Sequence, residues 1–146
     1  MQIPCFSRLG RALAAALLLH LAAAAHAQSA SLYERLGGGD QLSAIVSDLI
    51  DRSRTGPGTS RSFEKVNLKR LKEQITLHLC TLTGGPCSFA GDDLKTIHAG
   101  LNITQAEFYG LVEVLCQVLD DRGIGTREKN ELLALLAPFK RDVVTK

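Results

Sequence analysis

Only two of the four histidines, His78 and His98, follow residue 27, so imidazole chemistry in the rest of the chain depends on one of them. His98 is unusually placed, because it lies between Ile97 and Leu101 on the apolar stripe of a short predicted helix. A histidine on such a stripe either satisfies its hydrogen bonds inside a core or offers a ring nitrogen to a ligand. Its position alone leaves both alternatives open.

Three cysteines also follow residue 27. Cys80 and Cys87 are close enough in sequence to close a short loop by a disulfide in an oxidising compartment, which would leave Cys116 free. A zinc site of Cys80, Cys87 and His98 is the alternative, but this spacing matches no standard zinc pattern and a fourth ligand is missing. Cys116 is most simply a small buried apolar residue.

The first 27 residues have the pattern of a secretory leader. Arg8 and Arg11 precede an apolar run from Ala12 to Ala25, and Ala25-His26-Ala27 offers small side chains where a signal peptidase cleaves. The run is shorter than the ~20 residues that span a bilayer, which argues against a retained membrane anchor. We therefore expect residues 1–27 to be a cleaved signal peptide and residues 28–146 a periplasmic or secreted domain without membrane attachment.

Length and charge narrow the class of protein further. The chain has 146 residues, of which 45% are apolar, and this size suits one globular domain. It has 17 basic and 15 acidic residues, and loss of Arg8 and Arg11 with the leader balances the two signs. A domain with balanced charge has no net electrostatic attraction to a polyanion, so nucleic acid is not an expected partner.

The apolar pattern predicts an all-α fold, because four segments show a period of 3.6 and none shows a sustained period of 2. Asp40 and Thr126 are expected N-caps of the first and fourth long helices, and Thr104 with Glu107 forms a capping-box signature before the third. The predicted breaks are Asp51–Ser62, which contains Gly56-Pro57-Gly58, and the turn Gly84-Gly85-Pro86. The stripes run over Leu42–Ile50, Leu68–Leu82, Phe108–Leu119 and Leu132–Val143, with a short set over Leu94–Leu101.

A series of ordered motifs links these segments. Leu32-Tyr33-Glu34-Arg35-Leu36-Gly37-Gly38 precedes the first long helix, and Phe63 stands seven residues before Arg70-Leu71-Lys72. Gly84-Gly85-Pro86 then leads to Gly91 and to Leu94-Lys95-Thr96-Ile97-His98-Ala99-Gly100-Leu101-Asn102-Ile103-Thr104. In this order the motifs, from about Leu32 to Val144, resemble the group I truncated haemoglobins. The resemblance implies an all-α, truncated two-over-two globin fold that holds a haem.

The resemblance makes His98 the proximal ligand of the haem iron, because a neutral imidazole offers one nitrogen to iron while the other donates to a carbonyl. No Cys-x-x-Cys-His motif occurs, so we expect non-covalently bound haem b. Lys95, together with Arg70 and Lys72, is expected near the haem propionates. The expected apolar walls, each of which also fits an ordinary core position, are Ile50, Phe63, Leu71, Ile75, Leu79, Ile97, Leu101, Ile103 and Leu111.

The distal side departs from the family pattern. Many members place a tyrosine where this chain has Ile50, and Leu71 and Ile75 occupy the other usual distal positions. An aliphatic pocket lacks the hydrogen bond that stabilises bound O2, which puts oxidation of nitric oxide in doubt. His78 lies two helical turns after Leu71, so it is a candidate distal donor or sixth iron ligand, or else a partly exposed helix histidine.

These residues predict a haem protein that reversibly binds O2, CO or NO for transport or sensing. A haem enzyme, either a nitric oxide dioxygenase or a weak peroxidase, is the alternative and would need an electron donor. No distal acid–base pair of the kind that peroxidase chemistry requires is evident. A haem-free helical interaction module is the third possibility, and it would make His98 incidental.

Overall fold

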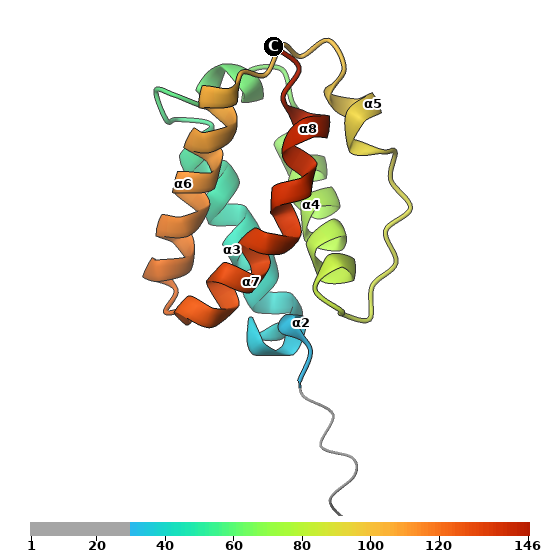
Figure 1. The fold of residues 1–146 in the computed structure, drawn as a ribbon, viewed down its shortest axis with the longest axis vertical. Coiled ribbons are helices and arrows are strands. Elements are labelled where there is room, and N and C mark those ends of the chain that lie inside the picture. Colours follow the sequence, from blue (N-terminus) through green and yellow to red (C-terminus); the bar gives the residue numbers. More distant parts are fainter. Residues whose placement is uncertain (1–29) are drawn as a thin grey trace, which may run out of the picture.

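The computed structural model describes residues 30–146, and the predicted leader at residues 1–27 lies outside them. All regular elements in the described part are helical, as predicted (Figure 1). Among residues 30–146, no helix has the length and apolar content needed to cross a bilayer. The elements are α2 (Leu32–Arg35), α3 (Gly38–Ser53), η2 (Ser60–Phe63), α4 (Leu68–Leu82), α5 (Leu94–His98), α6 (Gln105–Asp121), α7 (Thr126–Leu136), η3 (Ala137–Phe139) and α8 (Lys140–Val143).

The core forms where α3 packs against both α4 and α6. Its centre is a set of side chains with almost no solvent exposure, drawn from α3, α4, α6 and α7 of the predicted stripes and from the unpredicted α2. Burial of such side chains contributes about 1.5–3 kcal/mol each, so this contact is the main source of stability. The most deeply buried members include Leu42, Ile45, Val46, Ile50, Val118, Leu119 and Leu132.

The start of α3 differs from the prediction, because Gly37 and not Asp40 is the N-cap. Gly37 has φ 97°, a left-handed conformation that suits glycine and lets the chain turn from α2 into α3 within two residues, Leu36 and Gly37. Asp40 instead lies in the first turn, where its negative charge favours the helix dipole. The helix also continues to Ser53, and η2 at Ser60–Phe63 overlaps the end of the segment Asp51–Ser62 that was predicted to be irregular.

The last stripe is divided between three elements. Gly125, not Thr126, is the N-cap of α7, and the helix ends at Leu136. Pro138 lies within η3 and has no backbone N–H, which explains why a continuous helix to Val143 does not form. The chain therefore bends between α7 and α8 and brings α8 beside α5 (Figure 1).

The end of α4 follows the prediction closely. The helix stops at Leu82, and Gly84 has φ 81°. A Cβ on Gly85 would lie 2.6 Å from Cys80 Sγ and 2.6 Å from Tyr33 Cδ2, so only glycine fits this close approach. The Tyr33 N–H donates to the Thr83 carbonyl at 2.9 Å, which docks α2 on the end of α4.

Candidate functional site

The short helix α5 presents His98 at its last residue. Asp93 caps the helix, because its carboxylate accepts from the Thr96 N–H at 2.9 Å. Leu101 lies beyond the end of α5, so the helix is shorter than the two turns predicted. Five residues are too few for a helix to be stable alone, and the position of His98 therefore depends on what flanks α5.

The ring of His98 has a fixed orientation. Its Nδ1 lies 2.7 Å from the Leu94 carbonyl oxygen, one helical turn earlier. A carbonyl only accepts, so Nδ1 carries the proton and Nε2 retains a free lone pair. This is the tautomer that a metal-ligating histidine needs, with the second nitrogen held by a backbone carbonyl.

Most of the expected wall residues belong to one apolar cluster. Ile50 and Leu79 are buried within it, and Phe63, Leu71, Ile75 and Leu111 pack against it. These residues come from α3, η2, α4 and α6, and the four that pack against the cluster are only partly buried. The structure thus brings together the predicted distal and lateral walls.

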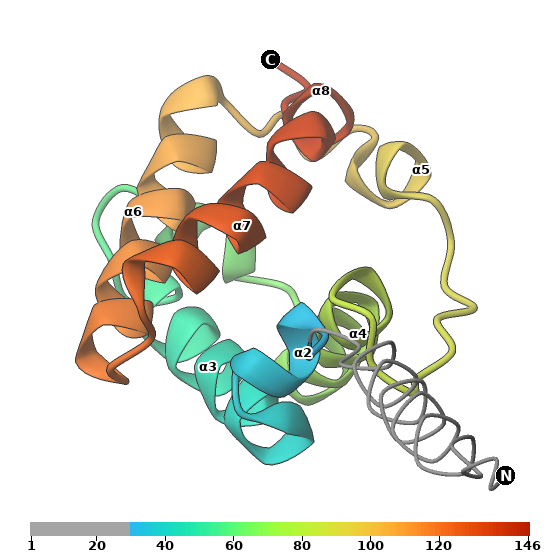
Figure 2. The same ribbon diagram turned by 60° about the horizontal axis from the view of Figure 1, so that its bottom comes forward.

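The expected wall residues near His98 do not belong to this cluster. Ile97 and Leu101 are 48% and 47% exposed, although both are large aliphatic side chains. Ile103 is buried but separate from the main core. In both ribbon views α5 lies apart from α4, and the loop of residues 83–93 joins them around the outside (Figures 1 and 2). About half of the Ile97 and Leu101 surfaces is therefore left exposed by the protein.

Two surface hollows in the described part of the chain lie elsewhere. One of about 290 Å³ borders Phe63 and Arg54, and one of about 540 Å³ runs along the outside of α3 and α4. Neither is lined by His98 or His78. The candidate site is therefore defined by the His98 lone pair and the apolar surfaces of α4 and α5.

His78 lies on α4 between two aromatic rings. Its ring centroid is 4.8 Å from that of Phe89 in the loop before α5 and 5.4 Å from that of Phe139 in η3, both edge-to-face. Its Nε2 is buried without a hydrogen-bond partner. Burial lowers the pKa of His78, so the ring is neutral near pH 7. Neither aromatic neighbour was predictable from local spacing, because Phe139 is distant along the chain and Phe89 is separated from His78 by a turn.

The basic residues expected near the propionates have different surroundings. Lys72 Nζ contacts Asp51 Oδ2 at 2.7 Å and Ser47 Oγ at 3.0 Å, so it pairs with α3. This contact lowers the pKa of Asp51. The role of Lys72 near a propionate stays a prediction, and in this structure its ammonium pairs with the Asp51 carboxylate. Lys95 and Arg70 are exposed and their role stays a prediction.

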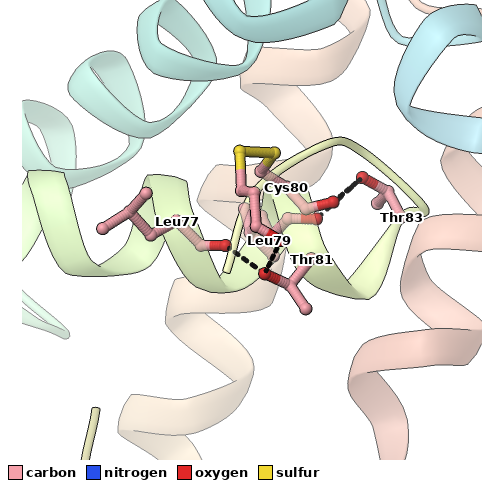
Figure 3. Close-up of a disulfide and its surroundings, with 6 residues drawn as sticks. Leu77, Leu79, Cys80, Thr81 and Thr83 are labelled. Carbon is pink, nitrogen blue, oxygen red and sulfur yellow. Dashed lines mark hydrogen bonds between the residues drawn. A yellow bond between two sulfur atoms is a disulfide. The ribbon is translucent and has the colours of Figure 1, made fainter. Parts of the chain in front are cut away.

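A disulfide joins Cys80, near the end of α4, to Cys87 in the following loop (Figure 3). Thr83 Oγ1 donates to the Leu79 carbonyl at 2.7 Å and Thr81 Oγ1 to the Leu77 carbonyl at 3.0 Å, so the helix end is firmly held (Figure 3). Residues 30–146 contain no cluster of three or more His, Cys, Asp or Glu suited to a metal ion. The zinc alternative is therefore wrong, because its two cysteines bond to each other.

Removing this disulfide should destabilise the fold by about 2 kcal/mol. A Cys80→Ser/Cys87→Ser variant frees the short loop in the unfolded chain, and the entropy of loop closure sets the size of the effect. Urea unfolding measures it, with Cys116→Ser as the matched control because that thiol is free. Equal midpoints for the double variant and the wild type would contradict a stabilising disulfide.

Glu107, at the start of α6, is the centre of a polar cluster that the sequence did not reveal. The capping box with Thr104 is present as predicted, but the carboxylate also accepts from Arg61 and Ser62, more than 40 residues earlier. The Arg61 guanidinium lowers the pKa of Glu107 to about 2. Nothing in local spacing indicates a partner so far away along the chain.

This pKa shift predicts acid sensitivity. Glu107 has a lower pKa folded than unfolded, so its stabilisation is complete above about pH 4.5 and is lost as the pH falls toward 2. Because Arg61 is 53% exposed, solvent screening keeps this contribution to the free energy of unfolding small. Chemical unfolding at pH 6 and pH 3 should show a smaller pH difference for Glu107→Gln than for the wild type. An identical pH difference would contradict the cluster.

Comparison with known proteins agrees with this geometry. A family model described as bacterial-like globin matches residues 31–145. The chain belongs to the bacterial-like globin family. The relatives of this globin include a group 1 truncated haemoglobin, GlbN, of Mycolicibacterium paratuberculosis, 29% identical over 119 residues that cover 82% of this chain and 88% of the relative. Another, from Chlamydomonas moewusii, is 26% identical and covers 78% and 68% of the two chains.

Solved structures support the fold of this globin. The truncated haemoglobin of Tetrahymena pyriformis in its Fe(III) form matches with a TM-score of 0.76 and 24% identity, over 80% of this chain and all of that one (100%). The 2/2 haemoglobin of Synechococcus sp. PCC 7002, described with covalently attached haem, has a TM-score of 0.74 and 20% identity, with coverages of 80% and 100%. The predicted truncated two-over-two globin fold is confirmed.

Proposed function

We propose that this globin binds haem b through His98 and reversibly binds a diatomic gas at the iron. The observation that carries the proposal is the Nδ1–H of His98 held by the Leu94 carbonyl, which leaves Nε2 free to ligate iron. Haem held by His98 would supply an iron that can take up a small diatomic ligand. The relatives are named haemoglobins, which supports a diatomic gas as the ligand of this globin.

The apolar residues support a flat, largely apolar cofactor. The aliphatic cluster that contains Ile50 faces the interior, whereas Ile97 and Leu101 leave nearly half of their surface uncovered. Burying about 400 Å² of macrocycle contributes roughly 10 kcal/mol before entropy costs. Protein packing therefore adds to the iron bond in holding the haem.

The distal residues favour reversible ligand binding over enzymatic turnover. Ile50, Leu71 and Ile75 are aliphatic, so they provide no hydrogen-bond donor to a bound ligand. The candidate ligands are O2, CO and NO. A nitric oxide dioxygenase or peroxidase stays the alternative, and it requires an electron donor of unknown identity.

His78 is the candidate distal group. Its buried Nε2 has no hydrogen-bond partner within the described residues, so a nearby ligand or the iron would satisfy it. The absorption spectrum of the ferrous, unliganded protein separates the two roles. A six-coordinate spectrum that becomes five-coordinate in His78→Leu supports axial ligation, whereas a five-coordinate wild type excludes it.

The proposal is tested by absorption spectroscopy of the purified protein, first ferric, then reduced, then exposed to CO. We expect an intense Soret band that shifts on reduction and again with CO. Acidified butanone should extract all the colour, because the haem is proposed to be non-covalent. Absence of a Soret band after haem supplementation would support the haem-free interaction module, and colour retained by the protein would exclude haem b.

We also propose that the protein is exported to the periplasm or outside the cell. The pattern of residues 1–27 supports a cleaved leader, and a disulfide is typical of an oxidising compartment. Fractionation of expressing bacteria followed by N-terminal sequencing tests this. Periplasmic protein that begins at Gln28 is the expected result, and cytoplasmic protein that begins at Met1 would contradict it.

A further inference from the structure

An arginine outside the expected haem walls joins the two sides of the site. Arg61 lies in η2, two residues before Phe63, and its Nε and Nη2 donate to the two carboxylate oxygens of Glu107, each at 2.8 Å. Nη2 also donates to the Asn102 carbonyl at 2.9 Å, and Nη1 to the Leu101 carbonyl at 3.3 Å. One guanidinium thus connects the turn that bears Phe63 with the segment that follows His98.

The direction of this guanidinium is fixed by Glu107. Its carboxylate accepts from Ser62 Oγ at 3.1 Å, from Thr104 Oγ1 at 2.8 Å and from the Thr104 N–H at 2.9 Å. The Glu107 side chain is only 12% exposed, so these bonds are partly shielded from water. A bidentate arginine–carboxylate pair has a rigid planar geometry, and lysine does not reproduce it.

The segment held by Arg61 consists of Leu101 and Asn102 and lies shortly after the end of α5. Asn102 has φ 53°, an uncommon conformation outside glycine, so its carbonyl direction is specifically set. The C-terminal residues hold the next position, because the Ile103 N–H donates to Thr145 Oγ1 at 3.0 Å and the Thr145 N–H donates to the Ile103 carbonyl at 2.9 Å. A helix of five residues takes its position from such anchors.

We propose that Arg61 is a positioning residue that sets the place of His98 relative to Phe63 by holding the carbonyls of Leu101 and Asn102 against η2. This inference rests on the proposed role of His98 as the iron ligand. It deepens that role by naming the contact that couples the proximal segment to the opposite wall. Arg61 touches neither the haem ligand nor the gas, so it acts through the backbone that follows His98.

The test compares Arg61→Met with Arg52→Met. Arg52 pairs with Asp121 at 2.7 Å and joins α3 to the end of α6, so it matches Arg61 as an exposed arginine in an inter-element ion pair. Its guanidinium bonds to Asp121, not to residues 94–104. The rate of haem transfer to an excess of apomyoglobin and the iron–histidine stretching band are measured for both variants.

We expect Arg61→Met to lose haem about tenfold faster than the wild type and to show a shifted or broadened iron–histidine band. Arg52→Met should stay within about twofold of the wild type with an unchanged band. Arg61→Lys should behave like Arg61→Met, because lysine keeps the positive charge but cannot form the bidentate pair with Glu107. If Arg61→Met does not fold, Arg61→Lys is used in its place. Equal behaviour of the Arg61 and Arg52 variants would overturn the proposal.

Hydrogen exchange of the haem-free protein separates this inference from the proposed function. The amides of Ala99, Leu101 and Ile103 each have a hydrogen bond in the structure. Faster exchange of residues 99–103 in Arg61→Met, and not in Arg52→Met, supports the positioning role even if the wild type shows no iron–histidine bond. Unchanged exchange in both variants would overturn it while leaving haem binding by His98 intact.

Discussion

Replacing His98 with glycine is expected to weaken haem binding by at least a hundredfold. The free Nε2 of His98 is the proposed bond to iron, and loss of an outer partner of a metal ligand alone costs about 10–100-fold. Apolar contacts with the macrocycle remain, so residual uptake at high haem concentration is compatible with this expectation. Titration of the haem-free variant with haem, followed at the Soret band, measures the change.

The matched control is His78→Gly, which removes the other histidine of the described chain. His78 packs on Phe89 and Phe139 and has no backbone carbonyl that fixes its ring, so its loss should change affinity far less. Circular dichroism of both haem-free variants checks that they retain the helical fold. Stronger loss of binding in His78→Gly than in His98→Gly would reverse the assignment of the proximal ligand.

Introducing a hydroxyl at position 50 is expected to slow O2 dissociation by about 10–100-fold. Ile50 is 1% exposed and occupies the position where related globins have a tyrosine, according to the sequence resemblance. A phenol there would donate a hydrogen bond to the bound ligand, worth about 1.5–3 kcal/mol when the acceptor carries charge. Stopped-flow displacement of O2 by CO measures the rate for Ile50→Tyr.

Ile50→Phe is the control for this experiment. It adds the same ring to a packed core and so has the same overpacking cost, but it carries no donor. The ratio of the two dissociation rates therefore reports the hydroxyl alone. Equal rates in Ile50→Tyr and Ile50→Phe would show that position 50 does not face the ligand, and the distal assignment of Ile50 would be wrong.

The long helices were predictable because their signals are local. The stripe of α4 and its stop at Gly84-Gly85 arise from helical periodicity and from backbone conformations that favour glycine. The capping box of Thr104 and Glu107 is likewise a four-residue pattern that the structure reproduces. Elements shorter than two turns carry a weaker periodic signal. For this reason α2 was not predicted, and α5 ends before Leu101, earlier than its apolar pattern indicated.

The polar connections across the site were not predictable, because they depend on tertiary placement. Arg61 meets Glu107 only after η2 folds against the start of α6, and no spacing rule joins residues 46 positions apart. The pairing of Lys72 with Asp51 likewise follows from the packing of α3 on α4. Sequence patterns thus located His98, whereas the contacts that hold its segment emerged from the fold.

The most direct test of the proposed iron ligand is resonance Raman spectroscopy of the ferrous, unliganded protein grown with ordinary or ¹⁵N-labelled histidine. We predict an iron–imidazole stretching band that moves to lower frequency with the label and disappears in His98→Gly. A ferrous protein without such a band, or a band that persists after His98 is replaced, would contradict the assignment of His98 as the bond between this globin and haem.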